Sequence, residues 1–237
     1  MANADPSQRH PPLAAGDAKI LEQAYAEAVR LGFLGPRELE RLWGRHLDDA
    51  LGLAAIRQPQ PGELWADLGS GAGLPGLPLA VAYRSASFTL IDAQRRRLDW
   101  VEKVAGELRL SNVSVVHARL EDYGHGPARH SFDVATARAL APLPVVAELG
   151  LPLLKTGGQL LVPRGRPATD ELDQASSACE QLGGRLDGII PNPSSPIDRL
   201  GFVVMMAKIA ATSPRFPRRS GVPAQTPLGQ LRENSGS

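Results

Sequence analysis

The chain of 237 residues has a mass of 25.2 kDa and a net charge of only +1, which suits one domain with a sizeable core and excludes a protein that binds polyanions through its overall charge. Its single cysteine, Cys179, excludes an internal disulfide framework and a metal site built from several cysteines. The sequence has neither a charged segment leading into an apolar run nor an apolar run of bilayer length, so we expect a cytoplasmic protein without a metal or membrane partner.

The N-terminal residues predict a disordered lead-in followed by a helix. Residues 1–15 are rich in Pro, Ala and polar side chains and show no hydrophobic period, as expected for a disordered segment. From Asp17 onward apolar residues recur at helical spacing, and Gly32 is placed to end the helix. We therefore expect the first helix between these two residues.

A second helix is predicted from Pro36, because the fixed φ of proline suits the first helical position. Its apolar stripe consists of Leu39, Leu42, Trp43, His46, Leu47, Ala50 and Leu51. His46 lies on this stripe and is expected to be a packed structural histidine, which Asp49 can orient from one turn away. Pro59 and the Pro-Gly pair after it end this helical extension, which we assign to residues 16–58.

Between residues 59 and 212 short apolar runs alternate with amphipathic segments. The predicted strands are Leu64–Leu68, Ser87–Ile91, Val113–His117, Phe132–Ala137 and Gln159–Val162. The predicted helices between them are Leu77–Tyr83, Arg95–Leu110 and Val145–Leu154. The Gly157-Gly158 pair is expected to form a turn that opens the fifth strand. This alternation predicts an α/β domain with a doubly wound, mostly parallel sheet.

The last part of the chain departs from this alternation. Two strands, Arg185–Ile190 and Phe202–Lys208, are joined by the Pro-rich segment Pro191–Pro196, which is too short for a crossover helix, so they are expected to pair antiparallel. Residues 213–237 form a Pro/Gly-rich tail with four arginines against one glutamate, expected to be extended or loosely docked.

A glycine loop follows the first predicted strand. Gly71–Gly76 reads GxGxxG, which is a weak signal when taken alone and fits any glycine-rich turn of an α/β protein. The loop lies between a strand and a helix, and Asp92 ends the next strand about 20 residues on, where a ribose-binding acid belongs. Both dinucleotide enzymes and methyltransferases use this arrangement.

The charges around the loop favour a cationic ligand. Asp67 stands two residues before Gly69, which gives the pattern DxGxGxG. S-adenosylmethionine carries a sulfonium and an ammonium group and has no phosphate, so a carboxylate beside the loop suits it. Pro75 and Pro78 remove two amide donors from the first turns of the helix, which weakens a phosphate site. We therefore predict a cofactor site for S-adenosylmethionine.

A third acidic residue follows the third strand. Glu121 can accept a hydrogen bond from the adenine amino group, while the backbone of Leu120 and Glu121 reads the edge of the ring. A solvated acidic loop is the alternative interpretation of this segment. Asp67, Asp92 and Glu121 nevertheless follow three successive strands, whose ends meet at the ligand crevice of such a sheet.

The segment after the fourth predicted strand restricts which class of atom can accept the methyl group. Thr136–Leu140 lacks the Asn/Asp-Pro-Pro-aromatic loop of exocyclic-amine methyltransferases. Cys179 falls in a helix beyond the fifth strand and is expected to be a packed residue, not a nucleophile. A ring nitrogen with a free lone pair needs only in-line placement against the methyl group. Arg138 is then expected to position the cofactor or the base.

Five segments carry a resemblance to a known family. They are Trp43–Asp49 (WGRHLDD), Asp67–Pro78 (DLGSGAGLPGLP), Ala118–Tyr123 (ARLEDY), Ala137–Ala139 (ARA) and Arg215–Pro223 (RFPRRSGVP). Through them the chain resembles, over residues 17–228, the glucose-inhibited division protein B family of bacterial small-subunit rRNA guanine-N7 methyltransferases. The Leu-Pro-Gly after the glycine loop and the Phe-Pro-Arg-Arg of the tail are the specific parts.

The resemblance implies a fold, a reaction and site residues. It implies a class I S-adenosylmethionine-dependent methyltransferase sheet with a helical N-terminal extension, and methylation of the N7 atom of a guanine in 16S rRNA. The residues it implies at the cofactor are Gly69, Leu74, Leu120, Glu121 and Arg138. The RNA contacts it implies are Arg164, Arg215, Arg218 and Arg219. The run Arg95–Arg97 is either a further contact or a solvated helix face.

The chain departs from the family pattern at a few positions. Asp48 stands where a hydrophobic residue is common, Ala50 where many members have Ser, and Arg164 where Lys is frequent. Ala224 and Gln225 follow Pro223 in a tail with fewer lysines. These differences bear on RNA contact more than on the cofactor site.

Three other functions compete with an rRNA methyltransferase. They are a small-molecule methyltransferase, a nicotinamide oxidoreductase, and a non-catalytic RNA-binding module that keeps the fold. If the chain is an rRNA methyltransferase, we expect a monomer that acts on small-subunit rRNA or on a ribosomal particle.

Overall fold

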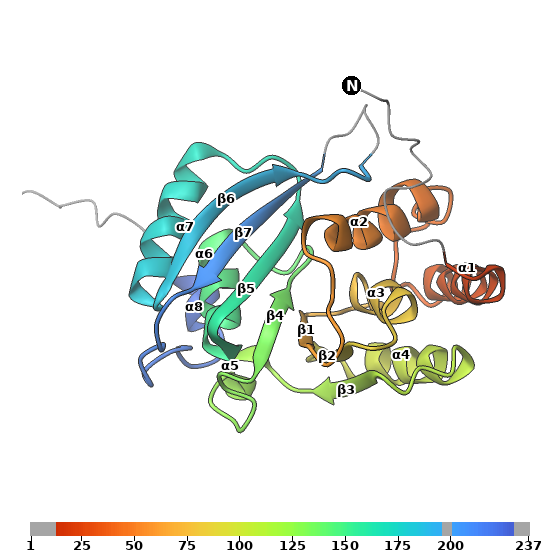
Figure 1. Cartoon of the computed structure of the whole chain (residues 1–237), viewed down its shortest axis with the longest axis horizontal. Helices are drawn as coiled ribbons and strands as arrows, with labels where there is room; N and C mark the ends of the chain where they lie inside the picture. The colour runs from red at the N-terminus through yellow and green to blue at the C-terminus, as the bar shows by residue number, and fades with distance from the viewer. Residues whose placement is uncertain (1–12, 196–200, 230–237) are drawn as a thin grey trace, which may run out of the picture.

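The computed structural model describes residues 13–195 and 201–229, so the first twelve residues of the predicted lead-in lie outside the described part (Figure 1). Within the described residues, seven strands form a sheet of order β3-β2-β1-β4-β5-β7-β6. The strands are β1 (Leu64–Leu68), β2 (Ser87–Asp92), β3 (Val113–His117), β4 (Phe132–Thr136), β5 (Leu154–Arg164), β6 (Gly184–Pro191) and β7 (Phe202–Lys208). The pairs among β1 to β5 are parallel, whereas β7 pairs antiparallel with β5 and β6, which confirms the predicted mostly parallel sheet.

Helices cover both faces of this sheet (Figure 1). One face packs against α1 (Ala15–Arg30), α2 (Asp48–Ile56), α3 (Gly76–Ala82) and α4 (Arg95–Glu107), and the other against α6 (Leu143–Gly150) and α7 (Thr169–Gln181). Side chains alternate along a strand, so Trp65 of β1 joins the first core while Ala66 joins the second. Cys179 is buried in the second core, as predicted.

The sheet has one topological switch point beside β1. The chain runs outward from β1 through β2 to β3, and then returns to place β4 on the other side of β1. In an open sheet of this kind the ligand crevice lies outside the carboxyl ends of the strands at such a point. The segments after β1, β2, β3 and β4 therefore meet at one edge.

The predicted second helix is wrong in its start. Residues 36–41 form turns, a π-helix covers Leu42–Leu47, and α2 begins only at Asp48. Because the chain does not run as one α-helix from Pro36, two members of the predicted apolar stripe, Leu39 and Trp43, are exposed. The predicted stop of the first helix is confirmed, since α1 ends at Arg30 and Gly32, two residues further on, has a φ of +74°.

Two predictions for the second half of the chain are also wrong. Gly157 and Gly158 lie inside β5 and not in a turn before it, and the pairing register between β4 and β5 shifts there. The tail is not loosely docked up to residue 229. Phe216 is buried in the second core, and Arg218 donates to the buried carboxylate of Glu148 on α6. The described tail also holds the short helix α8 (Val222–Gln225).

Candidate cofactor and acceptor site

The glycine loop after β1 depends on backbone conformations that favour glycine. Gly69, Gly71 and Gly73 have φ values of +65°, +54° and +71°. A Cβ on Gly69 would stand 2.6 Å from Cδ1 of Leu140, and one on Gly73 would stand 2.5 Å from Cδ1 of Leu77. The first of these contacts brings the loop after β4 against the glycine loop, across the switch point.

Asp67 is buried at the end of β1, directly below the loop. Its Oδ2 accepts a hydrogen bond of 2.8 Å from the N–H of Gly76, while its Oδ1 has no hydrogen-bond partner among the described residues. Burial raises the pKa of this carboxyl to about 7, although the Gly76 N–H and the nearby Arg138 act to lower it. A buried carboxylate oxygen without a partner fits a cationic ligand beside it.

The N-terminus of α3 offers little to a phosphate group. The Gly76 N–H is already bonded to Asp67, the Leu77 N–H donates to the Gly73 carbonyl at 2.7 Å, and Pro78 has no N–H. The Asp67 carboxylate, which is bonded to the Gly76 N–H at this helix start, would also repel the negative charge of a pyrophosphate. These contacts agree with the prediction that the helix start is a weak phosphate site.

Asp92 supports the same loop from β2. Its Oδ2 accepts from the Gly71 N–H at 2.9 Å, and its Oδ1 accepts from the Gln94 N–H at 2.8 Å. Each carboxylate oxygen has a second lone pair, so Asp92 can hold the loop and still accept from a ribose hydroxyl. Its side chain is 8% exposed, which leaves it at the wall of the crevice.

The segment that was predicted to bind the adenine ring follows β3 and lies at the same edge of the sheet. Leu120 and Glu121 begin the short helix α5 (Leu120–Tyr123), and the Leu120 side chain is buried. The Ala118 N–H donates to the Asp92 carbonyl at 3.1 Å, which ties this segment to the end of β2. The Glu121 Oε1 accepts from the N–H of Gly221 in the tail at 2.9 Å.

Arg138 is held by the N-terminal extension, which the sequence analysis did not foresee. One guanidinium N–H donates to Nδ1 of His46, and Nε2 of the same ring donates to Glu38 at 2.7 Å. Glu38 therefore orients His46, and Oδ1 of Asp49 accepts a hydrogen bond of 2.7 Å from the Ser195 hydroxyl. The π-helix, a conformation frequent at functional sites, carries His46 into this position.

Tyr25 of α1 is a second residue near the site, and its position among apolar residues at helical spacing predicts only a buried helix face. Its side chain is fully buried and its hydroxyl has no hydrogen-bond partner among the described residues. Burial raises the pKa of this phenol strongly, with Arg138 acting to lower it and Asp67 acting to raise it. Tyr25 thus lies within electrostatic reach of both site residues, and no local sequence pattern marks it.

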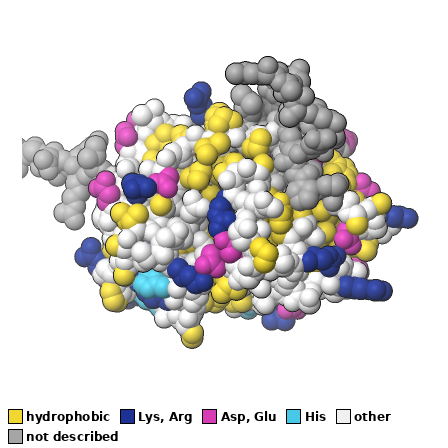
Figure 2. All heavy atoms as spheres, viewed as in Figure 1, with side chains coloured by type: hydrophobic (Ala, Val, Ile, Leu, Met, Phe, Trp, Pro, Cys, Tyr) yellow, Lys and Arg dark blue, Asp and Glu magenta, His cyan; other side chains and the backbone are white. Residues whose placement is uncertain are grey.

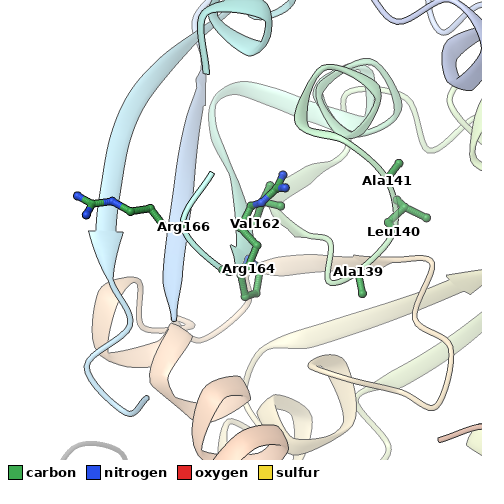
Figure 3. A pocket seen from close by; sticks show the side chains of 8 residues that line it. Ala139, Leu140, Ala141, Val162, Arg164 and Arg166 are labelled. Atoms are coloured by element: carbon green, nitrogen blue, oxygen red, sulfur yellow. The ribbon is translucent and has the colours of Figure 1, made fainter. Parts of the chain in front are cut away.

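A hollow of about 190 Å³ lies beside the glycine loop, between the loop after β4 and the end of β5 (Figure 3). It is lined by Ala139, Leu140, Ala141, Val162, Pro163, Arg164, Gly165 and Arg166. Leu140 belongs both to this lining and to the contact with Gly69, so the hollow adjoins the cofactor loop. Ala139 has a φ of +52°, a strained conformation for a residue with a side chain.

The arginines predicted to contact RNA differ in their surroundings. Arg164 pairs with Glu171 at 2.8 Å at the edge of the hollow. Arg218 is engaged with Glu148, which favours an anchoring role over RNA contact. Arg215 is exposed and lies over the Phe216 ring at 4.8 Å, and Arg219 is also exposed. On the face seen in Figure 2, Lys and Arg side chains are scattered among acidic ones and form no continuous patch.

The run on α4 is partly committed to contacts within the protein. Arg95 pairs with Asp99 at 2.7 Å, and Arg96 lies over the ring of Phe33 at 5.3 Å. Arg97 points its Nη1 toward Gly71, since a Cβ on that glycine would stand 3.6 Å from this atom. These contacts favour a structural role for the run.

The sheet order, the glycine loop anchored by Asp67, and the acids at the ends of β1 and β2 define a class I S-adenosylmethionine-dependent methyltransferase. A family model described as rRNA small subunit methyltransferase G matches residues 21–189. The chain belongs to this family and is an rRNA methyltransferase, which confirms the resemblance noted in the sequence.

Relatives of known name agree with this family. The chain is 41% identical over 200 residues to the ribosomal RNA small subunit methyltransferase G of Chloroflexus aggregans, covering 84% of this chain and 83% of the relative. It is 37% identical over 193 residues to the protein of the same name from Desulfitobacterium hafniense, covering 81% and 79%.

Solved structures share the fold at low identity. The S-adenosylmethionine-dependent O-methyltransferase of Thermotoga maritima superposes with a TM-score of 0.51 at 17% identity, covering 70% of this chain and 66% of that one. The geranyl diphosphate C-methyltransferase of Streptomyces coelicolor does so with a TM-score of 0.51 at 14% identity, covering 68% and 75%.

Neither a metal-binding group nor a membrane-spanning helix occurs among the described residues. In the part of the chain that the structure describes, His, Cys, Asp and Glu do not gather into a group that could hold a metal ion. No helix in that part is long and apolar enough to span a membrane.

Proposed function

We propose that this chain transfers the methyl group of S-adenosylmethionine to the N7 atom of a guanine in small-subunit rRNA, acting as a cytoplasmic enzyme. The observation that carries the proposal is the combination of a cation-binding carboxylate at the glycine loop with an acceptor hollow that lacks a general base. N7 of guanine carries a free lone pair, so the acceptor needs no deprotonation before it attacks.

The cofactor would lie along the edge formed by the ends of β1, β2 and β3. Asp67 would face its positively charged methionine end, Asp92 a ribose hydroxyl, and Glu121 the adenine amino group. Gly69 and Leu74 would line the path between them. When bound, the cofactor supplies a methyl group attached to a cationic sulfur. The sulfur is the leaving group and keeps the electron pair of the broken S–C bond.

The hollow between the loop after β4 and the end of β5 would hold the acceptor base. Its Leu140 wall touches the cofactor loop, so a flat ring in the hollow would lie close to a cofactor bound at that loop. Arg138 lies at the same loop and is fixed by His46 and Glu38, which lets it orient a bound group without a flexible search. Catalysis here is placement of two reactants and requires no proton transfer.

The first prediction concerns the methylated atom. Labelled methyl transfer to small-subunit RNA from cells that lack the protein is expected to yield 7-methylguanosine on nucleoside analysis. Mature subunits that already carry the modification serve as the control and should accept little label. Label on an exocyclic amine, a ribose or a small molecule would contradict the proposal.

The second prediction concerns RNA binding. The double substitution Arg215→Ala/Arg219→Ala is expected to weaken RNA binding and to lower the slope of log affinity against log salt by about 1–2, because each lost phosphate contact contributes nearly one. Arg185→Ala removes an exposed arginine of β6 and is the matched control. An unchanged slope in the double variant would remove these two residues from the RNA interface.

A further inference from the structure

The described tail packs against the segment that follows β3. We call residues 212–221 the tail segment and residues 120–129 the adenine segment, since Glu121 is proposed to meet the adenine. The two are far apart in the sequence, yet they are bonded along their length by both backbone and side-chain groups.

Arg129 joins the two segments through backbone carbonyls. Its Nη1 donates to Gly124 O at 2.9 Å in the adenine segment and to Phe216 O at 2.7 Å in the tail segment. Its Nη2 donates to Thr212 O at 2.8 Å and to Ser213 O at 3.1 Å. A planar guanidinium with its donors occupied in this way fixes the distance between the two backbones.

A second contact lies where the two backbones come closest. Nε2 of His125 donates to Pro217 O at 2.7 Å. A Cβ on Gly124 would stand 2.7 Å from Cγ of Pro217, so a side chain at this position would push the segments apart. Close packing of this kind leaves the adenine segment little freedom to shift.

The third contact reaches the proposed adenine-binding residue itself. The N–H of Gly221 donates to Oε1 of Glu121 at 2.9 Å, and Gly221 has a φ of +85° that suits glycine. The structure gives no hydrogen bond to the other oxygen, Oε2, among the residues that it describes. One oxygen is therefore held by the tail segment, while the second is available to a donor from a ligand.

An anchor on the other side keeps the tail segment in place. Arg218 donates from its backbone N–H at 2.8 Å and from Nε at 2.9 Å to Oε1 of Glu148, and from Nη2 at 2.6 Å to Oε2. Glu148 has no exposed surface, and the buried Phe216 ring lies in the same core. The tail segment is thus fixed to α6 at one face and to the adenine segment at the other.

We propose that the tail segment is a positioning element of the cofactor site, in which the Gly221 N–H and Arg129 set the Glu121 carboxylate for the adenine amino group. The inference rests on the proposed role of Glu121 and gives the tail a task that precedes any RNA contact. The N–H on Oε1 restricts the rotation of the carboxylate, so that Oε2 would be presented to the amino group. An adenine ring is then favoured over a ring with a carbonyl at the same position, which would face Oε2 with a second acceptor.

The test compares two ligands by calorimetry without RNA. S-adenosylhomocysteine carries the amino group, and S-inosylhomocysteine carries a carbonyl instead. Wild-type protein is expected to prefer the first by at least about 10-fold, the scale for a lost polar contact at a buried site. Gly221→Pro removes the N–H, shifts the local φ from +85° toward about −65°, and is expected to lower this preference by about fivefold or more. Gly221→Ala keeps the N–H at the same strained φ, with a Cβ 3.8 Å from Nε2 of Gln225, and should preserve more of the preference.

A second variant guards against a local rearrangement at Gly221. Arg129→Met removes the guanidinium donors between the two segments and is expected to lower the preference for S-adenosylhomocysteine as well. A general loss of stability would instead weaken the binding of both ligands by the same factor. Wild-type preference in folded Gly221→Pro and Arg129→Met proteins overturns the inference. If Glu121→Gln also leaves the preference unchanged, the proposed role of Glu121 fails too, and methyl transfer to RNA is then judged separately by its own product.

Discussion

Asp67→Asn is expected to weaken S-adenosylmethionine binding roughly 10- to 100-fold, the scale of about 1.5–3 kcal/mol for a contact with a charged group. The substitution keeps an oxygen that can accept from the Gly76 N–H and removes the negative charge beside the cationic ligand. Methyl transfer at low cofactor concentration should fall by the same factor. Calorimetry with the cofactor measures the loss directly.

The same substitution predicts a change in pH dependence. Burial raises the pKa of Asp67 to about 7, so part of the unliganded protein carries a proton there near neutral pH. A bound cation favours the ionised carboxyl, and wild-type affinity should therefore fall as the pH drops from about 7 to about 5. The α-amino group of the ligand stays charged over this range. The affinity of the variant should be nearly flat.

Stability should move in the opposite direction from function. Because the folded-state pKa of Asp67 lies above the ordinary value of 3.8, its contribution to stability is present below pH 3.8 and is lost as the pH rises through about 7. As the pH rises from 3.8 to about 7, the melting temperature of Asp67→Asn minus that of wild type should therefore increase. Asp99→Asn, on the exposed surface of α4, is the control that should change neither property. Wild-type affinity in Asp67→Asn would remove Asp67 from the cofactor site.

Arg218→Met is expected to lower the free energy of unfolding by about 3–5 kcal/mol, which is the scale for removing one partner of a buried ion pair. The substitution leaves the carboxylate of Glu148 in the core with the Arg218 backbone N–H as its remaining partner from that residue. Urea denaturation of the two proteins measures the difference. Arg215→Met, at an exposed arginine of the same segment, should stay within about 0.5 kcal/mol of wild type.

A double substitution separates the charge from the packing. Glu148→Leu/Arg218→Met replaces both partners by apolar side chains and should recover much of the stability that Arg218→Met loses, because no buried charge remains. A loss below about 1 kcal/mol in Arg218→Met would show that the pair is solvated and that the tail is not anchored there.

The elements that sequence alone predicted well are those with strong local signals. Leu64–Leu68 and Val113–His117 are short apolar runs with polar or turn residues at each end, and both strands have the predicted bounds. The alternation of strands with helices predicted the mostly parallel sheet, whereas the order of its strands is seen only in the structure. Residues 157–158 were misassigned because a glycine pair marks an irregular strand as well as a turn.

Only those site residues that follow directly after a predicted strand could be predicted from the sequence. Asp67, Asp92 and Glu121 stand at strand ends, so the topology brings them to one edge without any knowledge of side-chain packing. The bond between Arg138 and His46 joins residues 92 positions apart, and no local pattern encodes it. Tyr25 was indistinguishable from its apolar neighbours on α1, because helical spacing shows which face is buried but not what that face meets.

The tail contains little regular structure, which explains why its docking escaped prediction. Arg218 carries the same charge whether it faces RNA or a buried carboxylate, and only the position of Glu148 in the fold decides between them. A high content of proline and glycine indicates a segment without regular helices or strands. It does not indicate that the segment is detached from the hydrophobic core.

The docked tail segment also has a consequence for the order of synthesis. A ribosome makes all seven strands of the described sheet before it makes residues 212–221, so the nascent chain holds Asp67, Asp92 and Glu121 before it holds the N–H that bonds Glu121. A chain that stalls before Gly221 therefore contains the whole sheet but lacks the contact at the adenine end. On the proposed role of Glu121, the adenine end of the cofactor site would therefore be completed only after the described sheet has been made.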